Sequence, residues 1–239
     1  MATLHFLANP ARFRRFSQRV LPALAVVTAL ALAVGLVWGL MIAPPDYQQG
    51  DTVRIMFLHV PAAALAMMGY LLLAALGAAL LVWRHPLAAL MARAAAPVGA
   101  TYAAVGLLTG SLWGRPMWGT WWVWDARLTS FLLLFFLYLG HMALSRAWDD
   151  GERGDRAAAI LAVVGAINVP VIKFSVDWWN TLHQPASIMR LGGPSIDPAL
   201  LWPLLWMMAA LALLFVLLVL LRTETEIDRR RLAIAELAE

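Results

Sequence analysis

Residues 199–221, ALLWPLLWMMAALALLFVLLVLL, contain no charged side chain. About 20 apolar residues in a helix cross a hydrocarbon core of about 30 Å, so this stretch predicts a membrane-spanning helix. Five further stretches are also long and largely apolar, at residues 21–42, 56–83, 94–112, 128–147 and 157–174. We therefore predict an all-α integral membrane protein built as a bundle of six transmembrane helices.

The composition supports this fold class and limits the chemistry. The 239 residues are 62% hydrophobic and only 13% charged. A membrane β-barrel would need segments of about ten residues that alternate between apolar and polar, whereas these stretches are continuously apolar. The chain has no cysteine, so it forms no disulfide and no thioether bond to a cofactor. Any cofactor is expected to be held noncovalently or through atoms other than cysteine sulfur.

The basic residues predict the orientation in the membrane. They concentrate in the N-terminal arm 1–20, after the second and fourth helices, and in the tail 222–239. Because cytoplasmic loops are enriched in Lys and Arg, both termini are predicted to be cytoplasmic. The net charge of +4 follows from this topology, so no nucleic-acid partner is implied. The membrane domain 21–221 then directs three segments outward, at residues 43–55, 113–127 and 175–198, and these face the periplasm if the membrane is the inner membrane of a Gram-negative cell.

Segment 113–127, WGRPMWGTWWVWDAR, places five of the chain's twelve tryptophans within twelve positions. If the stretch after Pro116 is helical, one face of an interfacial helix carries Trp118, Trp121, Trp122 and Asp125. Anchoring at the membrane interface is the simpler explanation for any single tryptophan near a helix end. The density of this cluster favours a platform for a large planar apolar ligand, such as a porphyrin.

Two histidines are predicted at the same membrane face as the tryptophans. The second helix begins MFLHVP, residues 56–61, and the third outward segment includes VDWWNTLHQP, residues 176–185. Imidazoles from His59 and His183 could meet on opposite sides of a heme iron. A lone histidine near a helix end is more often a hydrogen-bonded surface residue, but two beside a tryptophan platform favour iron ligation.

Basic residues on the outward side suggest a site for anionic groups. Heme carries two propionates, and arginine binds carboxylates through charge-assisted, often bidentate hydrogen bonds. Arg54 and Arg127 are predicted to bind the propionates because each adjoins a proposed heme element. Contact with lipid headgroups, or pairing with a nearby aspartate, is the alternative for each arginine. The basic residues on or near the outward segments are Arg54, Arg115, Arg127, Lys173 and Arg190.

These motifs resemble those of the heme-handling membrane proteins of cytochrome c biogenesis, and the chain most resembles the cytochrome c maturation protein C family. The tryptophan-rich motif appears as WGTWWVWD, residues 118–125, and the histidine motif as VDWWNTLHQP. The resemblance covers nearly the whole chain in length, helix count and order of motifs. It implies a noncovalent b-type heme at the periplasmic face, with axial ligands His59 and His183 and a platform of Trp118, Trp121, Trp122, Trp124 and Asp125.

The resemblance also implies partners within the membrane. Family members pass heme to a membrane-anchored periplasmic heme chaperone, of the cytochrome c maturation protein E type. A small single-helix partner of the protein D type and two ABC transporter subunits, of the A and B types, belong to the same complex. Covalent heme attachment occurs on the chaperone, so this chain is expected to deliver heme and not to be an enzyme.

Two other functions stay open. A b-type heme electron-carrier subunit of a membrane oxidoreductase would also pair histidines, but at facing depths inside the bilayer. A protein that itself moves heme across the membrane is the second alternative. The absence of a P-loop excludes self-powered ABC transport. Passage driven by a partner stays possible, because small residues in the third and fifth helices allow shifting contacts.

Overall fold

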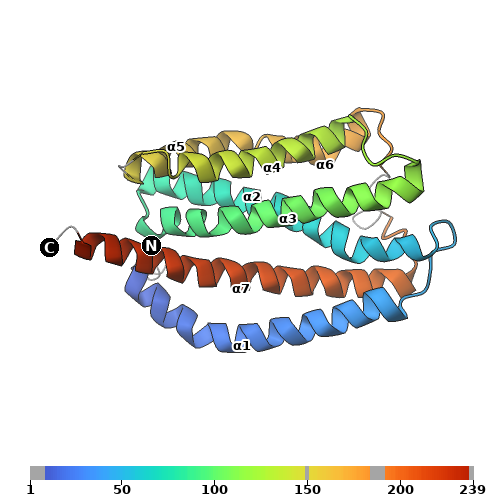
Figure 1. Ribbon diagram of the computed structural model, residues 1–239, viewed down its shortest axis with the longest axis horizontal. Coiled ribbons are helices and arrows are strands. Elements are labelled where there is room, and N and C mark those ends of the chain that lie inside the picture. Colours follow the sequence, from blue (N-terminus) through green and yellow to red (C-terminus); the bar gives the residue numbers. More distant parts are fainter. Residues whose placement is uncertain (1–8, 149–150, 184–191, 237–239) are drawn as a thin grey trace.

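The structure, a computed structural model, describes residues 9–148, 151–183 and 192–236, and these ranges contain helices but no β-strand. Within these described ranges, six helical segments are long and apolar enough to cross a membrane, which confirms the predicted all-α bundle. The elements, traced in Figure 1, are α1 (Pro10–Val37), η2 (Trp38–Ile42), η3 (Asp51–Ile55), α2 (Met56–Trp83), α3 (Pro86–Trp118), α4 (Ala126–Leu144), α5 (Gly151–Gly165), α6 (Asn168–Trp178) and α7 (Pro198–Glu236).

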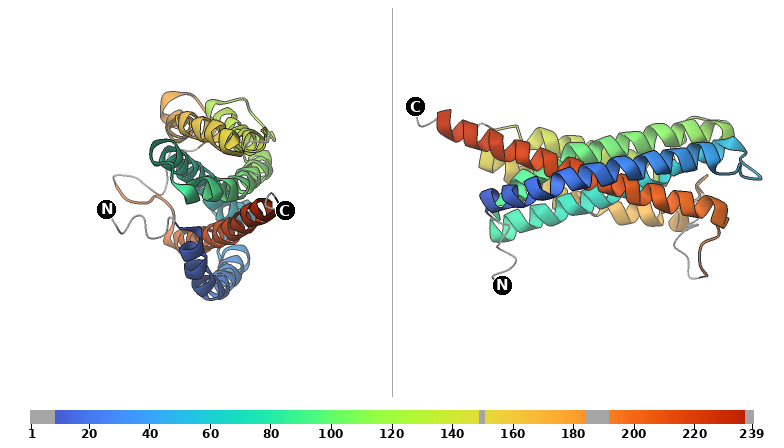
Figure 2. Two further views of the ribbon diagram at one scale, coloured as in Figure 1. Left: turned by 90° about the vertical axis from the view of Figure 1, so that its left-hand side faces the viewer. Right: turned by 90° about the horizontal axis from the view of Figure 1, so that it is seen from below.

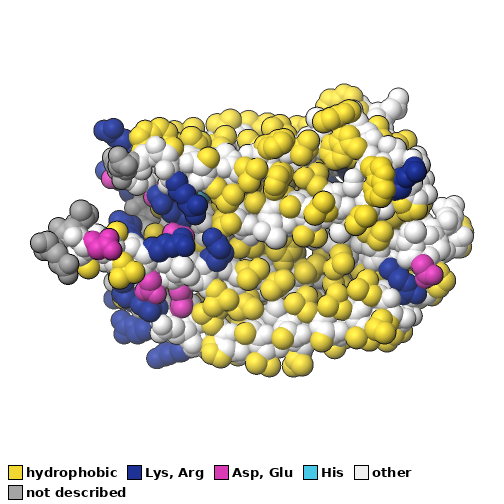
Figure 3. Space-filling model, viewed as in Figure 1, with side chains coloured by type: hydrophobic (Ala, Val, Ile, Leu, Met, Phe, Trp, Pro, Cys, Tyr) yellow, Lys and Arg dark blue, Asp and Glu magenta, His cyan; other side chains and the backbone are white. Residues whose placement is uncertain are grey.

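The helices lie side by side along the long axis of the molecule (Figures 1 and 2). α1 packs on α7, α2 packs on α3, and α4 packs on both α5 and α6. We call the end where α1 begins and α7 ends the basic end, and the opposite end, which holds the loop 119–125, the tryptophan end. On the face drawn in Figure 3, a broad hydrophobic band lies between the two ends, and Lys and Arg side chains gather mainly at the basic end.

Two buried tyrosines and several small residues form the centre of the bundle. Tyr70 of α2 and Tyr138 of α4 are fully buried, and their ring centroids lie 5.1 Å apart. The Tyr138 hydroxyl donates to the carbonyl oxygen of Ala66 at 2.7 Å, which satisfies it in an apolar interior. Gly99 of α3 faces the same ring, and a Cβ there would overlap it. Small residues therefore set the close approach of these helices, as is common in membranes.

The fifth spanning segment is interrupted, whereas the sequence predicted one continuous helix over 157–174. α5 ends at Gly165 and α6 begins at Asn168. Pro170 explains the interruption, because proline has no N–H to donate and its ring clashes with the carbonyl four residues earlier. The Asn168 side chain donates to the carbonyl oxygen of Ser130 at 2.8 Å, which ties the start of α6 to α4.

The last helix continues into the predicted cytoplasmic tail, through residues 222–236. Ile227 is buried there against Phe13 of α1. Asp228 forms an ion pair with Arg14 at 2.8 Å. Charged residues end the apolar run that marks the span, but they do not end the helix, because these side chains find partners on α1.

A glycine and an aspartate fix the turn between α3 and α4. Gly119 follows the last residue of α3 with φ of +77°, a left-handed conformation that glycine adopts without steric strain. Asp125 caps α4, since its Oδ1 accepts the N–H of Leu128 at 2.7 Å. The loop 119–125 is therefore held at both of its ends.

Candidate functional site

The tryptophan-rich segment is divided between a helix and a loop. Residues 113–118 form the last part of α3, whereas residues 119–125 are not helical and run back to the start of α4 (Figure 1). The expectation of one helical face was therefore wrong, because Gly119 ends the helix directly after Trp118. The residues expected on that face were Trp118, Trp121, Trp122 and Asp125.

The loop backbone is anchored while two of its indole rings stay accessible. The Ser111 hydroxyl donates to the carbonyl oxygen of Trp121 at 2.6 Å. The Trp121 side chain is 55% exposed and that of Trp124 is 75% exposed. Trp122 packs edge-on against Trp124 with ring centroids 5.4 Å apart, and its buried Nε1 has no partner among the described residues. Aromatic surface is thus available to a ligand or a partner.

His59 lies in the first turn of α2 and faces α3. Its Nδ1 is 3.1 Å from the Gly106 carbonyl oxygen and 3.1 Å from the Thr109 hydroxyl. A carbonyl oxygen only accepts, so Nδ1 carries the proton and Nε2 keeps a free lone pair. The ring of Trp113 packs edge-on against the imidazole at 5.7 Å between centroids. Gly110 makes room for the ring, because a Cβ there would lie 2.9 Å from His59 Cε1.

His183 lies in the connection after α6 and contacts the tryptophan-rich segment. Its Nδ1 is 3.6 Å from Asp125 Oδ2, a separation longer than a hydrogen bond. The Thr181 hydroxyl donates to the same carboxylate oxygen and accepts the His183 backbone N–H at 3.2 Å. The ring of Trp118 lies edge-on against the imidazole with centroids 4.8 Å apart. Asp125 therefore joins the start of α4 to this histidine.

The structure brings the two histidines together. They lie close enough that a positive charge on His183 would repel one on His59. Burial lowers the pKa of His183, and the charge of Arg127 lowers it further, while the Asp125 carboxylate opposes both. The imidazole of His183 is therefore neutral at neutral pH, which is the form that binds a metal.

Arg127, in the first turn of α4, belongs to the same neighbourhood. Its Nε donates to the Ser175 hydroxyl at 3.3 Å, and a terminal nitrogen donates to the Lys173 carbonyl oxygen at 3.2 Å. These bonds fasten α4 to α6 and hold the guanidinium where its charge acts on His183.

Arg54 lies apart from this arrangement. It donates to the Asp51 carboxylate at 3.1 Å and to the Leu40 carbonyl oxygen at 3.0 Å, across the connection between η2 and η3. These contacts do not include either histidine. Arg190, and residues 184–185 of the histidine motif, lie outside the described residues.

Three residues of α3 contribute to the site without having been singled out from the sequence: Gly106, Thr109 and Gly110. Gly106 and Gly110 are four positions apart, a spacing that places both on one helix face. That face lies against His59. The only sequence signal for it was the pair of glycines in an apolar helix, which is also common in ordinary membrane packing.

A sequence model of the family described as heme exporter protein C matches residues 3–238. The chain belongs to the heme exporter protein C family. Heme exporter protein C of Bradyrhizobium diazoefficiens is 62% identical over 231 residues, which cover 96% of this chain and 87% of that protein. The Escherichia coli K12 relative is 47% identical over 238 residues, covering 98% and 96%. The Paracoccus denitrificans relative is 47% identical over 230 residues, covering 95% and 94%.

The match to the heme exporter protein C family spans all the helices and connections that build the site. Residues 3–238 include α1 through α7, both histidines and the complete tryptophan-rich segment. The family resemblance noted at two short motifs is therefore confirmed over the whole chain. Together with six helices able to span a membrane, family membership makes this a multi-pass bacterial membrane protein.

Proposed function

We propose that the protein binds heme noncovalently at the tryptophan end and delivers it for cytochrome c biogenesis. The observation that carries this proposal is the pair of neighbouring imidazoles, His59 and His183, which come from separate elements. The relatives are named heme exporter protein C, which supports heme as the cargo.

The histidine environments suit iron ligation. His59 donates from Nδ1 to a backbone carbonyl, so its Nε2 is the ligand atom. In His183 the Asp125 carboxylate beside Nδ1 favours a proton there and a free lone pair on Nε2. A carboxylate near the distal ring nitrogen also makes an imidazole a stronger ligand. Both residues therefore fit as the axial pair of a b-type heme.

The surrounding side chains suit the porphyrin and its propionates. Trp121 and Trp124 offer exposed indole surface, which can cover an apolar macrocycle with little loss of side-chain entropy. Trp118, which contacts His183, and Trp122, which contacts Trp124, complete the platform. Arg127 is our first choice for a propionate, because its charge already reaches His183. Arg54 is a second choice, because it would have to give up its hydrogen bonds to Asp51 and Leu40 to bind a propionate.

An open aromatic site fits delivery better than permanent storage. We place the tryptophan end in the periplasm of the inner membrane, because the basic end has the charge expected of a cytoplasmic face. The heme edge would then be reachable by a membrane-anchored chaperone of the protein E type. A single-helix D-type partner and ABC subunits of the A and B types complete the proposed complex. Heme attachment belongs to the chaperone, so this chain is not the enzyme.

An absorption titration of the purified protein with hemin tests the ligand pair. Protein made without its partners should give a low-spin bis-imidazole spectrum. His59→Gly and His183→Gly should each lose it, because one ligand is missing. Exogenous imidazole should restore it, since the glycine leaves room for a free ring. Far-ultraviolet circular dichroism of each variant verifies that the helices are retained.

Two results would contradict the proposal. Unchanged low-spin spectra in both glycine variants would remove these histidines from the iron. A low-spin spectrum together with reversible electron transfer to a quinone, but no transfer to the chaperone, would favour the electron-carrier alternative. Heme passage to the purified chaperone, followed as a covalent adduct, separates these two functions.

A further inference from the structure

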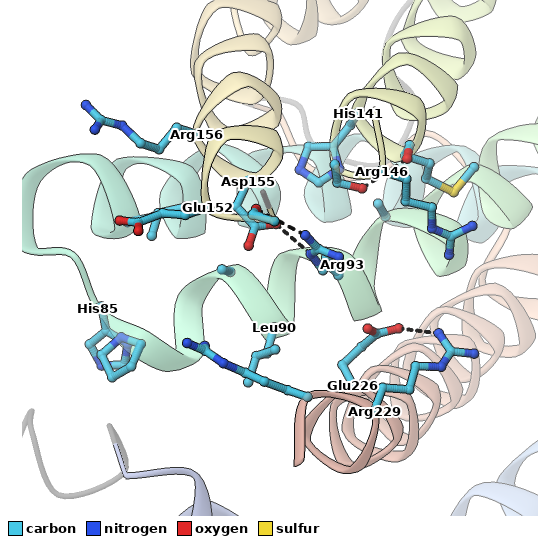
Figure 4. Close-up of a pocket in the computed structure, with 18 of the residues that line it drawn as sticks. His85, Leu90, Arg93, His141, Arg146, Glu152, Asp155, Arg156, Glu226 and Arg229 are labelled. Carbon is cyan, nitrogen blue, oxygen red and sulfur yellow. Dashed lines mark hydrogen bonds and ion pairs between the residues drawn. The ribbon is translucent and has the colours of Figure 1, made fainter. Parts of the chain in front are cut away.

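A second site candidate lies at the basic end, far along the bundle from both proposed heme ligands. A partly open cavity of about 880 Å³ is lined there by the ends of α2, α3, α4, α5 and α7. Figure 4 shows side chains from these helices converging on it, among them Arg93, His141, Asp155 and Glu226. Nothing in the proposed heme site at the tryptophan end uses these residues.

The cavity carries an excess of positive charge. Among the described residues, six arginines line it against three carboxylates, those of Glu152, Asp155 and Glu226. Asp155 pairs with Arg93 at 2.6 Å, and Glu226 pairs with Arg229 at 2.8 Å (Figure 4). The remaining lining arginines, Arg84, Arg146, Arg156 and Arg230, leave the cavity attractive to an anion.

A buried histidine in the wall points independently to a ligand. His141 of α4 is only 2% exposed, and its Nδ1 has no hydrogen-bond partner among the described residues. A buried polar atom without a partner is unfavourable, so such atoms usually meet a water or a bound group. The cavity that His141 lines offers a polar space where such a group can sit.

The other side of the cavity wall is apolar. Leu80, Leu81 and Leu90 line it together with Pro97 and Met142. The cavity therefore lies between the basic end of the bundle and its hydrophobic band. Figure 3 shows these two regions next to each other on the surface. A ligand that satisfies both parts has an anionic head and an apolar body. Basic pockets between membrane helices on the cytoplasmic side commonly bind the headgroups of anionic lipids.

We propose that this cavity binds an amphipathic anion, whose phosphate or carboxylate groups lie against the arginines and whose apolar body lies along the leucines. Two molecules share this chemistry: an anionic phospholipid of the adjoining leaflet, and heme with its propionates. Binding of a phospholipid would be independent of the proposed function. Binding of heme rests on the proposed function, and the cavity would then be a second heme site at the opposite end of the bundle.

Native mass spectrometry and a hemin titration test the site and distinguish the sources. The test variant is Arg84→Gln/Arg146→Gln/Arg230→Gln, which removes three lining charges without breaking the ion pairs of Arg93 or Arg229. The control is Arg15→Gln/Arg19→Gln, which removes two positive charges from α1, both outside the residues that line the cavity. Cardiolipin and phosphatidylcholine are titrated in detergent, and hemin is titrated into a His59→Ala/His183→Ala background.

Cardiolipin retention by wild type and control, with affinity reduced by about tenfold or more in the triple variant, would support the phospholipid source. Hemin binding in the histidine-free background, lost in the triple variant, would support the heme source. Binding of neither probe, or equal binding by triple variant and control, would overturn the proposal. If the triple variant does not fold, the three single variants must each weaken binding. In proteins that keep His59 and His183, the bis-imidazole spectrum reports separately on the tryptophan end.

Discussion

The carboxylate of Asp125 lies 3.6 Å from Nδ1 of His183, so the residue that caps α4 also places a negative charge beside a proposed iron ligand. The loop 119–125 connects this carboxylate to α3, whose Trp118 packs edge-on against the same imidazole. The start of α4, the end of α3 and the segment after α6 therefore meet at one histidine. This arrangement makes the chemistry of His183 sensitive to single substitutions on other elements.

Substituting Asp125 separates its two roles. Asp125→Asn keeps an oxygen that can cap α4 but removes the charge beside His183, so we expect heme to bind with a higher reduction potential. A less basic imidazole stabilises ferric iron less. Asp125→Ala should also lose the cap, at a cost of about 1 kcal/mol in stability. Spectroelectrochemistry and thermal unfolding measure the two effects. Equal potentials in wild type and Asp125→Asn would remove the carboxylate from the ligand's environment.

Heme binding should weaken only in moderately acidic solution. A proton competes with iron for His183, and burial and Arg127 lower the pKa of this histidine below its ordinary value of 6.5. Affinity should therefore begin to fall at a lower pH than it would for a histidine of ordinary pKa, by up to about tenfold per pH unit once the folded-state pKa is passed. The low-spin fraction, measured against pH, gives this onset.

Two charge variants should move this onset in opposite directions. Arg127→Gln removes a positive charge that lowers the His183 pKa, so loss of heme should begin at higher pH. Asp125→Asn removes the opposing carboxylate, so the loss should begin at lower pH. Shifts of the same sign in both variants would show that the onset reports on another group.

Hydrophobic run length predicted the membrane bundle well, because the bilayer makes strong demands on composition. It did not predict the break at Ala166–Ile167, which depends on the single residue Pro170. It also missed the extension of α7 through residues 222–236, because ion pairs such as Arg14 with Asp228 connect helices far apart in sequence. The local sequence does not show which helices pack together or which charged residues pair, so the end of α7 could not be predicted from it.

Only part of the candidate site could be predicted from the sequence, because the rest depends on which helices pack together. Motif density pointed to Trp118, His59 and His183, and the structure brings an indole and both imidazoles into one neighbourhood. The prediction that Trp118 through Asp125 form one helical face was wrong, because α3 ends before Gly119. The role of Gly110, which leaves room for the His59 ring, could not be predicted because it depends on which face of α3 packs against α2.

Gly110 should tolerate no side chain if His59 is a ligand. In Gly110→Ala the new Cβ would lie 2.9 Å from His59 Cε1 and push the ring from its bond to Gly106. Overpacking of this kind costs about 1–3 kcal/mol, so we expect heme affinity to fall by about tenfold. Hemin titration measures it. Gly140→Ala is the control, because only the flexible tip of Leu161 lies within 4 Å of its Cβ. Equal affinities in the two variants would contradict this role of His59.

Trp118 should control how quickly heme leaves. Its ring lies edge-on against His183 at 4.8 Å between centroids, and such aromatic pairs contribute about 0.5–1.5 kcal/mol. Trp118→Ala frees the imidazole to move, so we expect heme release to accelerate by several-fold up to about tenfold. Trp118→Phe keeps an aromatic edge and should fall between wild type and alanine.

Stopped-flow transfer of heme to apomyoglobin measures this release. Trp83→Ala is the matched control, because Trp83 is 70% exposed at the last residue of α2, at the basic end. It should release heme at the wild-type rate. If Trp118→Ala also releases at that rate, the ring positions the loop without restraining the ligand. If Trp83→Ala accelerates release as much, the effect reflects a general loosening of the bundle and not the Trp118–His183 contact.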